Sequence, residues 1–198
     1  TSELSENAIL PRITLVLPTW NEAKVIEGKL EGIKSQNYPK ELLEVIIIDA
    51  CSSDSTIDLV KAWLQRNNLA DSSDYRIIQE KERRGKSVSI NRAFSEARPE
   101  SEILMMSDVD CRLSEGALIK IARRFSDPSI GAISGRQILL NPNESVRSHG
   151  EVGYRDFFNR IRTAESQLCS TPIFHGECSA YRRTAISGHK LVENSNAD

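Results

Sequence analysis

Four short apolar runs, each followed by a segment with helical periodicity, alternate along the first two thirds of the chain. These runs cover residues 13–17, 43–49, 75–78 and 103–110. Runs of this length are typical of buried strands, and the apolar stripes between them are typical of helices. Strands that alternate with helices over short connections favour right-handed βαβ crossovers. The sequence therefore predicts a mostly parallel sheet with helices on both faces.

The regular alternation of strand and helix patterns ends in the last third of the chain. A fifth strand-like region covers residues 130–140, and residues 146–168 have the pattern of one long helix of mixed charge. The helices expected earlier in the chain cover residues 25–36, 57–64, 86–97 and 114–125. The first part is typical of a nucleotide-binding platform, and the later part is interpreted as substrate-specific additions.

Two carboxylates, Asp108 and Asp110, end the fourth apolar run. In an open α/β sheet, ligands bind just beyond the carboxyl ends of such strands. Two like charges at this position repel each other unless a cation lies beside them, and carboxylate oxygens suit Mg²⁺ or Mn²⁺. A plain acidic turn that caps the following helix is the alternative. The place of the pair after the fourth strand favours a metal site.

The composition fits one soluble globular domain. The chain has 198 residues, of which 39% are hydrophobic and 27% charged, and its net charge of −2 gives no general reason to expect a nucleic acid partner. The four cysteines lack CxxC spacing, which disfavours a zinc site and favours reduced thiols in a cytoplasmic protein. We find no signal peptide and no apolar run near 18 residues, so no membrane span is expected.

Other common uses of such a platform conflict with particular residues. A dinucleotide-binding domain needs glycines after the first strand, but residues 18–22 are bulky and acidic. Gly85-Lys86-Ser87 lacks the first glycine of a P-loop, because Glu80 stands there. An aspartate-nucleophile phosphatase would carry its acids after the first strand, and a nucleotidyltransferase would have a glycine-rich, basic first loop. A phosphate-bearing ligand held by a metal remains.

In five sequence motifs the chain resembles the family 2 glycosyltransferases of the GT-A fold. Residues 16–22, VLPTWNE, match the family's V-x-P-x-Y-N-E, and residues 47–56, IIDACSSDST, resemble its V-V-D-D-G-S-T-D-G-T. Arg84, Gly85 and Lys86, followed by Asn91, match the basic helix start R-x-G-K-x-x-A-x-N. The fourth match is the DxD at Asp108–Asp110, and residues 176–183 resemble the acceptor-side G-x-x-x-x-x-R-R. Five motifs in the right order make the resemblance specific.

The resemblance implies a role for particular residues. The donor would contact residues from the first four motifs, namely Pro18, Thr19, Trp20, Glu22, Asp49, Ser52, Arg84, Gly85, Lys86 and Asp108. Asp108 and Asp110 would ligate Mg²⁺ or Mn²⁺, and Gly176, Glu177 and Arg182 would lie on the acceptor side. The family's second acid after strand two, often linked to recognition of the base, is Ala50 here. The identity of the nucleotide therefore stays open.

The resemblance also sets the expected domain limits. A lead-in covers residues 1–11, and a GT-A domain covers residues 12–198, with a nucleotide-binding part to about residue 140 and an acceptor part beyond it. The family carries its general base on a late acid pair, so Asp198 would be its first member, with the partner cut away. We therefore expect the truncated catalytic core of a longer, membrane-associated enzyme that acts at the cytoplasmic face on a glycan or lipid acceptor.

The predicted fold is a GT-A, Rossmann-like α/β/α sandwich with a mostly parallel central sheet. The predicted function is metal-dependent, inverting transfer of a sugar from a nucleotide-diphosphate sugar to a hydroxyl group. Two alternatives stay open: a nucleotidyltransferase that forms a nucleotide sugar, and a non-enzymatic nucleotide-binding domain.

Overall fold

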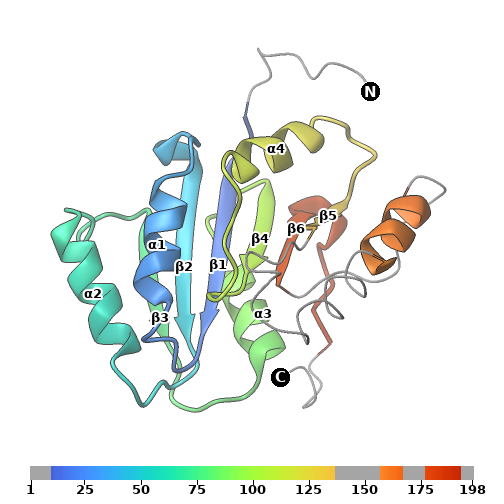
Figure 1. Ribbon diagram of the computed structural model, residues 1–198. Coiled ribbons are helices and arrows are strands. Elements are labelled where there is room, and N and C mark those ends of the chain that lie inside the picture. Colours follow the sequence, from blue (N-terminus) through green and yellow to red (C-terminus); the bar gives the residue numbers. More distant parts are fainter. Residues whose placement is uncertain (1–9, 137–156, 167–176, 193–198) are drawn as a thin grey trace. The chain divides into compact units, whose positions relative to one another are not determined.

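The computed structural model describes residues 10–136, 157–166 and 177–192. The chain divides into two compact units, one of residues 1–133 with 176–198 and the other of residues 134–175. Six strands form one sheet in the order β3-β2-β1-β4-β6-β5 (Figure 1). Their bounds are β1 Ile13–Thr19, β2 Leu43–Asp49, β3 Tyr75–Gln79, β4 Ile103–Ser107, β5 Ala132–Ser134 and β6 Cys178–Arg182.

The centre of the sheet is parallel, as predicted. Strand β1 pairs in parallel with β2 on one side and with β4 on the other, and β2 pairs in parallel with β3. All residues of β2 and β4 are buried, which explains why these strands are nearly continuous apolar runs in the sequence. The sheet of a Rossmann-like α/β protein is thereby confirmed.

Helices cover both faces of the sheet. Their bounds are α1 Ile26–Lys34, α2 Thr56–Arg66, α3 Lys86–Glu96 and α4 Ala117–Arg124, and 3-10 turns cover Lys40–Leu42 and Arg183–Ala185. Helices α1, α2 and α4 pack on one face, where Leu30, Trp63 and Leu118 join its core. Helix α3 packs on the other face through Ile90 and Phe94. The predicted three-layer α/β/α arrangement is confirmed.

The strand order places a crevice between β1 and β4. The chain runs from β1 outward through β2 to β3 and then crosses to β4 on the other side of β1. Neighbouring parallel strands whose connections leave in opposite directions open a gap at their carboxyl ends, where ligands bind in such sheets. Pro18 and Thr19 end β1 at this point, and Asp108 directly follows β4.

The later elements differ in part from the sequence prediction. The expected strand at residues 130–140 is described only as β5, Ala132–Ser134, and residues 137–140 lie outside the described part. Of the expected helix at residues 146–168, residues 157–166 are described and are helical. Strand β6, interpreted beforehand only as an acceptor segment, pairs antiparallel with β4. It was missed because a five-residue, partly buried strand lacks the long apolar run of a central strand.

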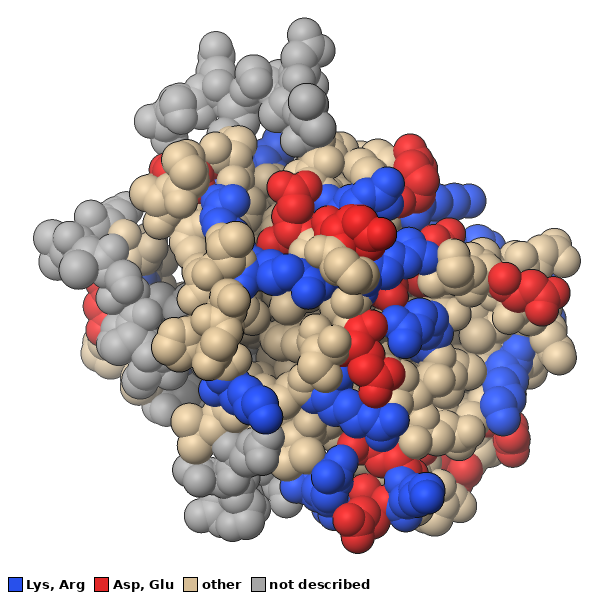
Figure 2. All heavy atoms as spheres, turned by 180° about the vertical axis from the view of Figure 1, so that it is seen from behind, with Lys and Arg blue, Asp and Glu red and all other residues tan. Residues whose placement is uncertain are grey.

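The surface carries charges of both signs, and the described helices are short. Basic and acidic side chains are intermingled on the face turned to the viewer in Figure 2. Within the described ranges, no helix is long and apolar enough to cross a membrane.

Candidate active site

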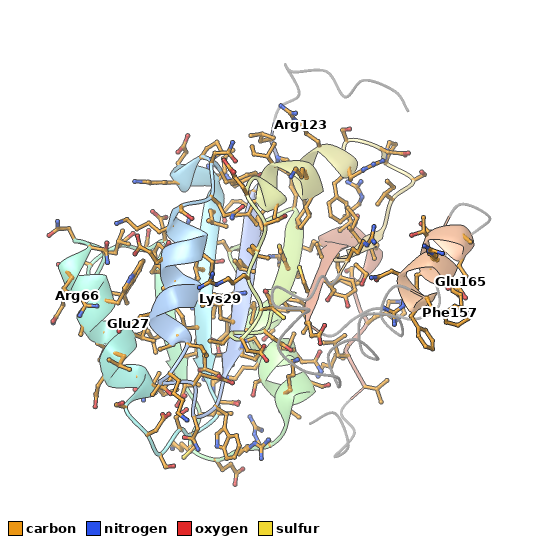
Figure 3. The ribbon with its side chains drawn as sticks, in the orientation of Figure 1. Glu27, Lys29, Arg66, Arg123, Phe157 and Glu165 are labelled. Carbon is orange, nitrogen blue, oxygen red and sulfur yellow. The ribbon has the colours of Figure 1, made fainter. Side chains whose placement is uncertain are left out.

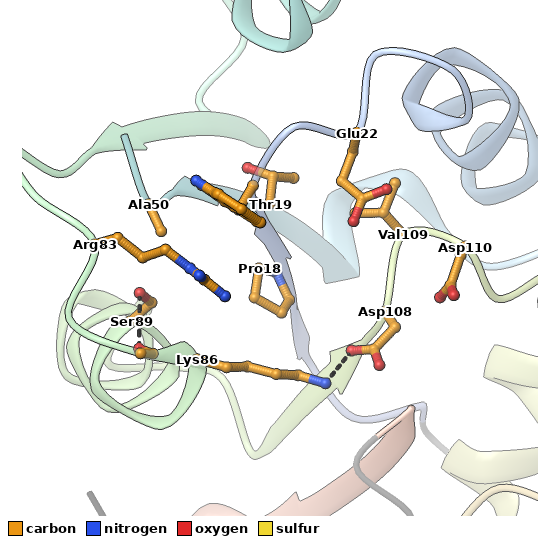
Figure 4. A pocket seen from close by; sticks show the side chains of 12 residues that line it. Pro18, Thr19, Glu22, Ala50, Arg83, Lys86, Ser89, Asp108, Val109 and Asp110 are labelled. Carbon is orange, nitrogen blue, oxygen red and sulfur yellow. Dashed lines mark hydrogen bonds and ion pairs between the residues drawn. The ribbon is translucent and has the colours of Figure 1, made fainter. Parts of the chain in front are cut away.

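A pocket opens at the crevice between the carboxyl ends of β1 and β4 (Figure 4). Its lining residues come from the end of β1, the four loops that follow β1, β2, β3 and β4, and the start of α3; they are Pro18, Thr19, Trp20, Glu22, Ala50, Arg83, Gly85, Lys86, Ser89, Asp108, Val109 and Asp110. All of them belong to the compact unit that carries the sheet.

The two sides of the pocket carry opposite charge. Figure 4 shows the carboxylates of Glu22, Asp108 and Asp110 on one side and the cationic groups of Arg83 and Lys86 on the other. The Lys86 ammonium crosses to the acidic side, where its Nζ lies 2.5 Å from Asp108 Oδ1. This charge distribution suits a ligand that has anionic groups and that also shares a cation with the carboxylates.

Three carboxylates of like charge, those of Glu22, Asp108 and Asp110, lie on the acidic side of the pocket. Glu22 follows β1, and its pKa is raised by burial and then by the negative charges of Asp110, Asp108 and Asp54. A raised carboxylate pKa means that the charged form is disfavoured, as expected for a partly buried acid that lies near other acids. A divalent cation bound here would relieve the repulsion.

The basic side depends on the turn before α3. Gly85 precedes the helix with φ +103°, a conformation that side chains with a Cβ rarely adopt. The turn leaves Gly85, Lys86 and Ser89 along the pocket, so the first turn of α3 borders it. Backbone N–H groups of a first helical turn have no partner within the helix and favour anions.

Arg83 and Trp20 line the part of the pocket near Ala50. The Arg83 guanidinium carbon lies 3.8 Å from the centre of the Trp20 ring, a cation–π contact. Trp20 is 44% exposed, which is unusual for so large an aromatic side chain. The pair therefore presents a flat, partly open surface away from the carboxylates.

The structure brings eight of the proposed site residues to this pocket: Pro18, Thr19, Trp20, Glu22, Gly85, Lys86, Asp108 and Asp110. Two others, Asp49 and Ser52, do not line the pocket. The Asp49 carboxylate is buried and accepts hydrogen bonds from the backbone N–H of Ser52 at 3.0 Å and from its hydroxyl at 2.5 Å. Ser52 Oγ in turn accepts from Asn21 N–H, so this pair links the loops after β1 and β2.

Arg84 does not line the pocket. Its guanidinium lies 3.1 Å from the buried carboxylate of Glu80, which also accepts a hydrogen bond from the Ser89 hydroxyl. The residue that reaches the pocket is Arg83, which the sequence analysis did not select. Counted back from Gly85, the arginine of R-x-G-K falls on Arg83, and this spacing was the signal available in the sequence.

The acceptor-side residues have different positions. Arg182 does not line the pocket; its guanidinium donates to the carbonyl oxygens of Phe125, Asp127 and Ile130. Glu177 is closer, because its carbonyl oxygen accepts a hydrogen bond from Asp108 N–H at 2.9 Å. Gly176 and Asp198 lie outside the described residues.

The carboxylates fit a divalent metal that is shared with a ligand. In the described part of the chain, no group of three or more Asp, Glu, His or Cys could hold a metal ion by itself. Mg²⁺ is commonly bound by one or two carboxylates together with substrate phosphates, and Mn²⁺ also prefers oxygen ligands. Asp108 and Asp110 suit such a shared site.

Comparison with known protein families gives a match over most of the chain. The model described as "Glycosyl transferase family 2" matches residues 14–189. Among curated proteins, the poly-beta-1,6-N-acetyl-D-glucosamine synthase of Staphylococcus epidermidis is 22% identical over 183 residues, which are 92% of this chain and 42% of that protein. An N-acetylglucosaminyltransferase of Rhizobium meliloti is 24% identical and is matched over the same 42% of its length. The chain thus spans less than half the length of these curated relatives.

Solved structures agree with this match. A mannosyltransferase from Pyrobaculum calidifontis, in complex with GDP-Man and Mn²⁺, has a TM-score of 0.79 and 33% identity over 96% of this chain and 50% of that chain. S. aureus TarS in complex with UDP-GlcNAc has a TM-score of 0.51 and 24% identity over 68% of this chain and 38% of that chain. The likeness to TarS supports the fold alone.

Proposed function

The chain belongs to glycosyltransferase family 2, and we propose that it transfers a sugar from a nucleoside-diphosphate sugar to a hydroxyl acceptor, with inversion and with Mn²⁺ or Mg²⁺ held at Asp108 and Asp110. Membership in a nucleotide-sugar transferase family establishes the class of enzyme. The metal, the stereochemistry, the donor and the acceptor belong to the proposal.

One observation carries the proposal: cationic and anionic side chains face each other across one pocket at the β1–β4 crevice. A nucleoside diphosphate is an anion that binds both to basic side chains and, through a shared divalent cation, to carboxylates.

The residues of the basic side would stabilise the leaving group. When the bond between sugar and diphosphate breaks, negative charge grows on the diphosphate, and Lys86 and the first turn of α3 are placed to compensate it. The metal, when bound, supplies further compensation of the same charge. No covalent intermediate is needed for such a displacement.

The incoming hydroxyl group needs a general base. We assign this role to Asp198, from the family's late acid pair. The acceptor would be a hydroxyl group of a glycan or a lipid, with Gly176, Glu177 and Arg182 on its side of the site. A longer enzyme that works at the cytoplasmic face of a membrane remains part of this proposal.

The far end of the pocket favours a guanine nucleotide as donor. With the metal end at Asp108 and Asp110, the base would lie near Ala50, Trp20 and Arg83. The Arg83 guanidinium only donates hydrogen bonds, so it can contact the acceptor atoms of a base. The O6 and N7 atoms of guanine are the acceptor pair that arginine binds best. The mannosyltransferase with 33% identity, in its complex with GDP-Man, supports this assignment.

A nucleotidyltransferase is the alternative enzyme, and the reaction product separates the two. Incubation with nucleotide sugar, Mn²⁺ and an acceptor alcohol should release a nucleoside diphosphate. Release of pyrophosphate from a nucleoside triphosphate and a sugar phosphate would overturn the proposal. Tight binding of nucleotide sugar with no turnover by the complete enzyme would indicate a binding domain instead.

A further inference from the structure

A lysine lies in the apolar stripe of α1. Ile26, Leu30 and Ile33 face the sheet and have 1% exposure or less, and Lys29 lies between them with 5% exposure. Its side chain runs from the helix toward the sheet (Figure 3). A lysine is almost never buried to this degree unless its ammonium has partners, so its contacts need an explanation.

The Lys29 ammonium contacts the two ends of the segment that contains the acids. Its Nζ donates to Ser107 Oγ at 2.7 Å and to the carbonyl oxygen of Cys111 at 2.7 Å. Ser107 is the last residue of β4, and Cys111 directly follows Asp110. The two hydrogen bonds therefore hold both ends of the segment Asp108–Asp110, and Lys29 itself does not line the pocket.

The charges around Lys29 fit this position. Burial lowers its pKa, and the negative charges of Asp108 and Asp110 act in the opposite direction. The Cys111 and Cys178 side chains also lie near it, but the pKa of Cys111 is raised to about 11, so this thiol is neutral at neutral pH. A cation near two carboxylates lowers their mutual repulsion, and Lys29 does so without lining the pocket.

We propose that Lys29 is a positioning residue: it fixes the segment Asp108–Asp110 so that both carboxylates can share a divalent metal with the donor diphosphate. This inference rests on the proposed function, because it assumes a metal at these acids. A lysine that served only the stability of the core would, when replaced, change the stability of the fold, because the Ser107 hydroxyl and the Cys111 carbonyl oxygen would lose a donor. It would not change the metal affinity of the folded protein.

The test compares Mn²⁺ binding with nucleotide binding in the wild type, three single variants and the double variant Lys29→Met/Ser107→Ala. Lys29→Met keeps an unbranched side chain but has no donor, and Ser107→Ala removes one of the two acceptors. Lys34→Met is the matched control, because Lys34 lies on the same helix, is exposed, and donates to Asn67 away from the pocket. Electron paramagnetic resonance would report free Mn²⁺ in the presence of GDP or UDP, and calorimetry would give nucleotide affinity in EDTA.

We expect the Mn²⁺ affinity of the nucleotide complex to fall at least tenfold in Lys29→Met and less in Ser107→Ala. Nucleotide affinity in EDTA should stay close to that of the wild type, and Lys34→Met should bind Mn²⁺ like the wild type. Thermal unfolding of Lys29→Met should stay cooperative but occur at a lower temperature, because two buried acceptors lose their donor. The double variant should bind Mn²⁺ no more weakly than Lys29→Met, because the two residues act through one hydrogen bond.

Different results would overturn different claims. Unchanged Mn²⁺ affinity in a folded Lys29→Met would overturn this inference alone, as would an equal loss of affinity with Mn²⁺ and in EDTA. If Lys29→Met does not fold, Ser107→Ala decides, and an unchanged Mn²⁺ affinity in that variant overturns the inference. A wild type whose nucleotide affinity is the same with and without Mn²⁺ would overturn the proposed function and this inference with it.

Discussion

Lys86 Nζ lies 2.5 Å from Asp108 Oδ1, so the start of α3 is joined across the pocket to the segment that follows β4. Both side chains are partly exposed, 30% and 21%. The ion pair occupies the place where a donor diphosphate and its metal would each need one of the partners. Binding of the donor should therefore replace this pair by a contact of Lys86 with phosphate and of Asp108 with the metal.

The first prediction concerns Lys86 and its neighbour Arg84. Lys86→Ala should weaken binding of a nucleoside diphosphate by about 1.5–3 kcal/mol, the usual range for a hydrogen bond to a charged group, and leave nucleoside binding nearly unchanged. Arg84→Ala is the matched control, because Arg84 is paired with Glu80 and does not line the pocket. Calorimetry on both variants checks this, and an equal loss in both would show that the loop acts as a whole.

The second prediction concerns the base. Arg83→Ala should reduce GDP affinity by about 1–3 kcal/mol, the range for a bidentate contact to guanine, and should hardly change UDP affinity. Competition binding with both nucleotides measures the preference. Stronger binding of UDP than of GDP by the wild type would refute the assignment of a guanine donor.

The third prediction concerns the pH dependence of stability through Glu22. Burial and the charges of Asp110 and Asp108 raise its pKa above the ordinary 4.5, so the folded state binds this proton more tightly than the unfolded state. The free energy of unfolding should therefore fall as the pH rises from 4.5 through the raised pKa. Glu22→Gln should lack this decrease and be the more stable protein at neutral pH. Urea unfolding in EDTA at several pH values checks the difference, and identical pH profiles would contradict it.

The fourth prediction concerns the general base. Asp198→Asn should lower the rate of sugar transfer by about 10²–10⁴-fold, the usual contribution of general base catalysis. Donor affinity should stay the same, because the donor residues precede position 141. The assay measures transfer to an acceptor alcohol by the wild type and by Asp198→Asn, both as the complete enzyme. An unchanged rate would place the base at another residue.

The central strands could be predicted because burial on both faces leaves a plain pattern. Residues 43–49 form a fully buried strand, and their sequence is nearly all apolar apart from Glu44 and Asp49. The position of Asp108 and Asp110 followed from the same pattern, since a polar stop after a buried strand lies at the ligand edge of the sheet. Strand β6 could not be found this way, because only Ser179 and Ala180 of its five residues are buried.

The side-chain directions at the site could not be predicted from sequence. Arg83 and Arg84 are chemically identical neighbours, and apart from the R-x-G-K spacing no feature of the sequence shows which of them reaches the pocket. From the sequence, Asp49 could either contact a ligand or cap the loop after β2. In the structure its carboxylate accepts a hydrogen bond from the backbone N–H of Ser52 and so caps this loop. Lys29 did leave a signal, because a lysine between Ile26 and Ile33 interrupts an apolar helical face.

The most direct test of the account is calorimetric titration of a nucleoside diphosphate into the wild type and into Asp110→Asn, each with Mn²⁺ and with EDTA. Asp110 is exposed at the end of a turn, so Asp110→Asn should fold normally. We predict that EDTA weakens binding to the wild type at least tenfold and that Asp110→Asn shows the weak affinity under both conditions. Equal affinity of the wild type with and without Mn²⁺, or full Mn²⁺-dependent affinity in Asp110→Asn, would contradict a metal-assisted donor site at this pocket.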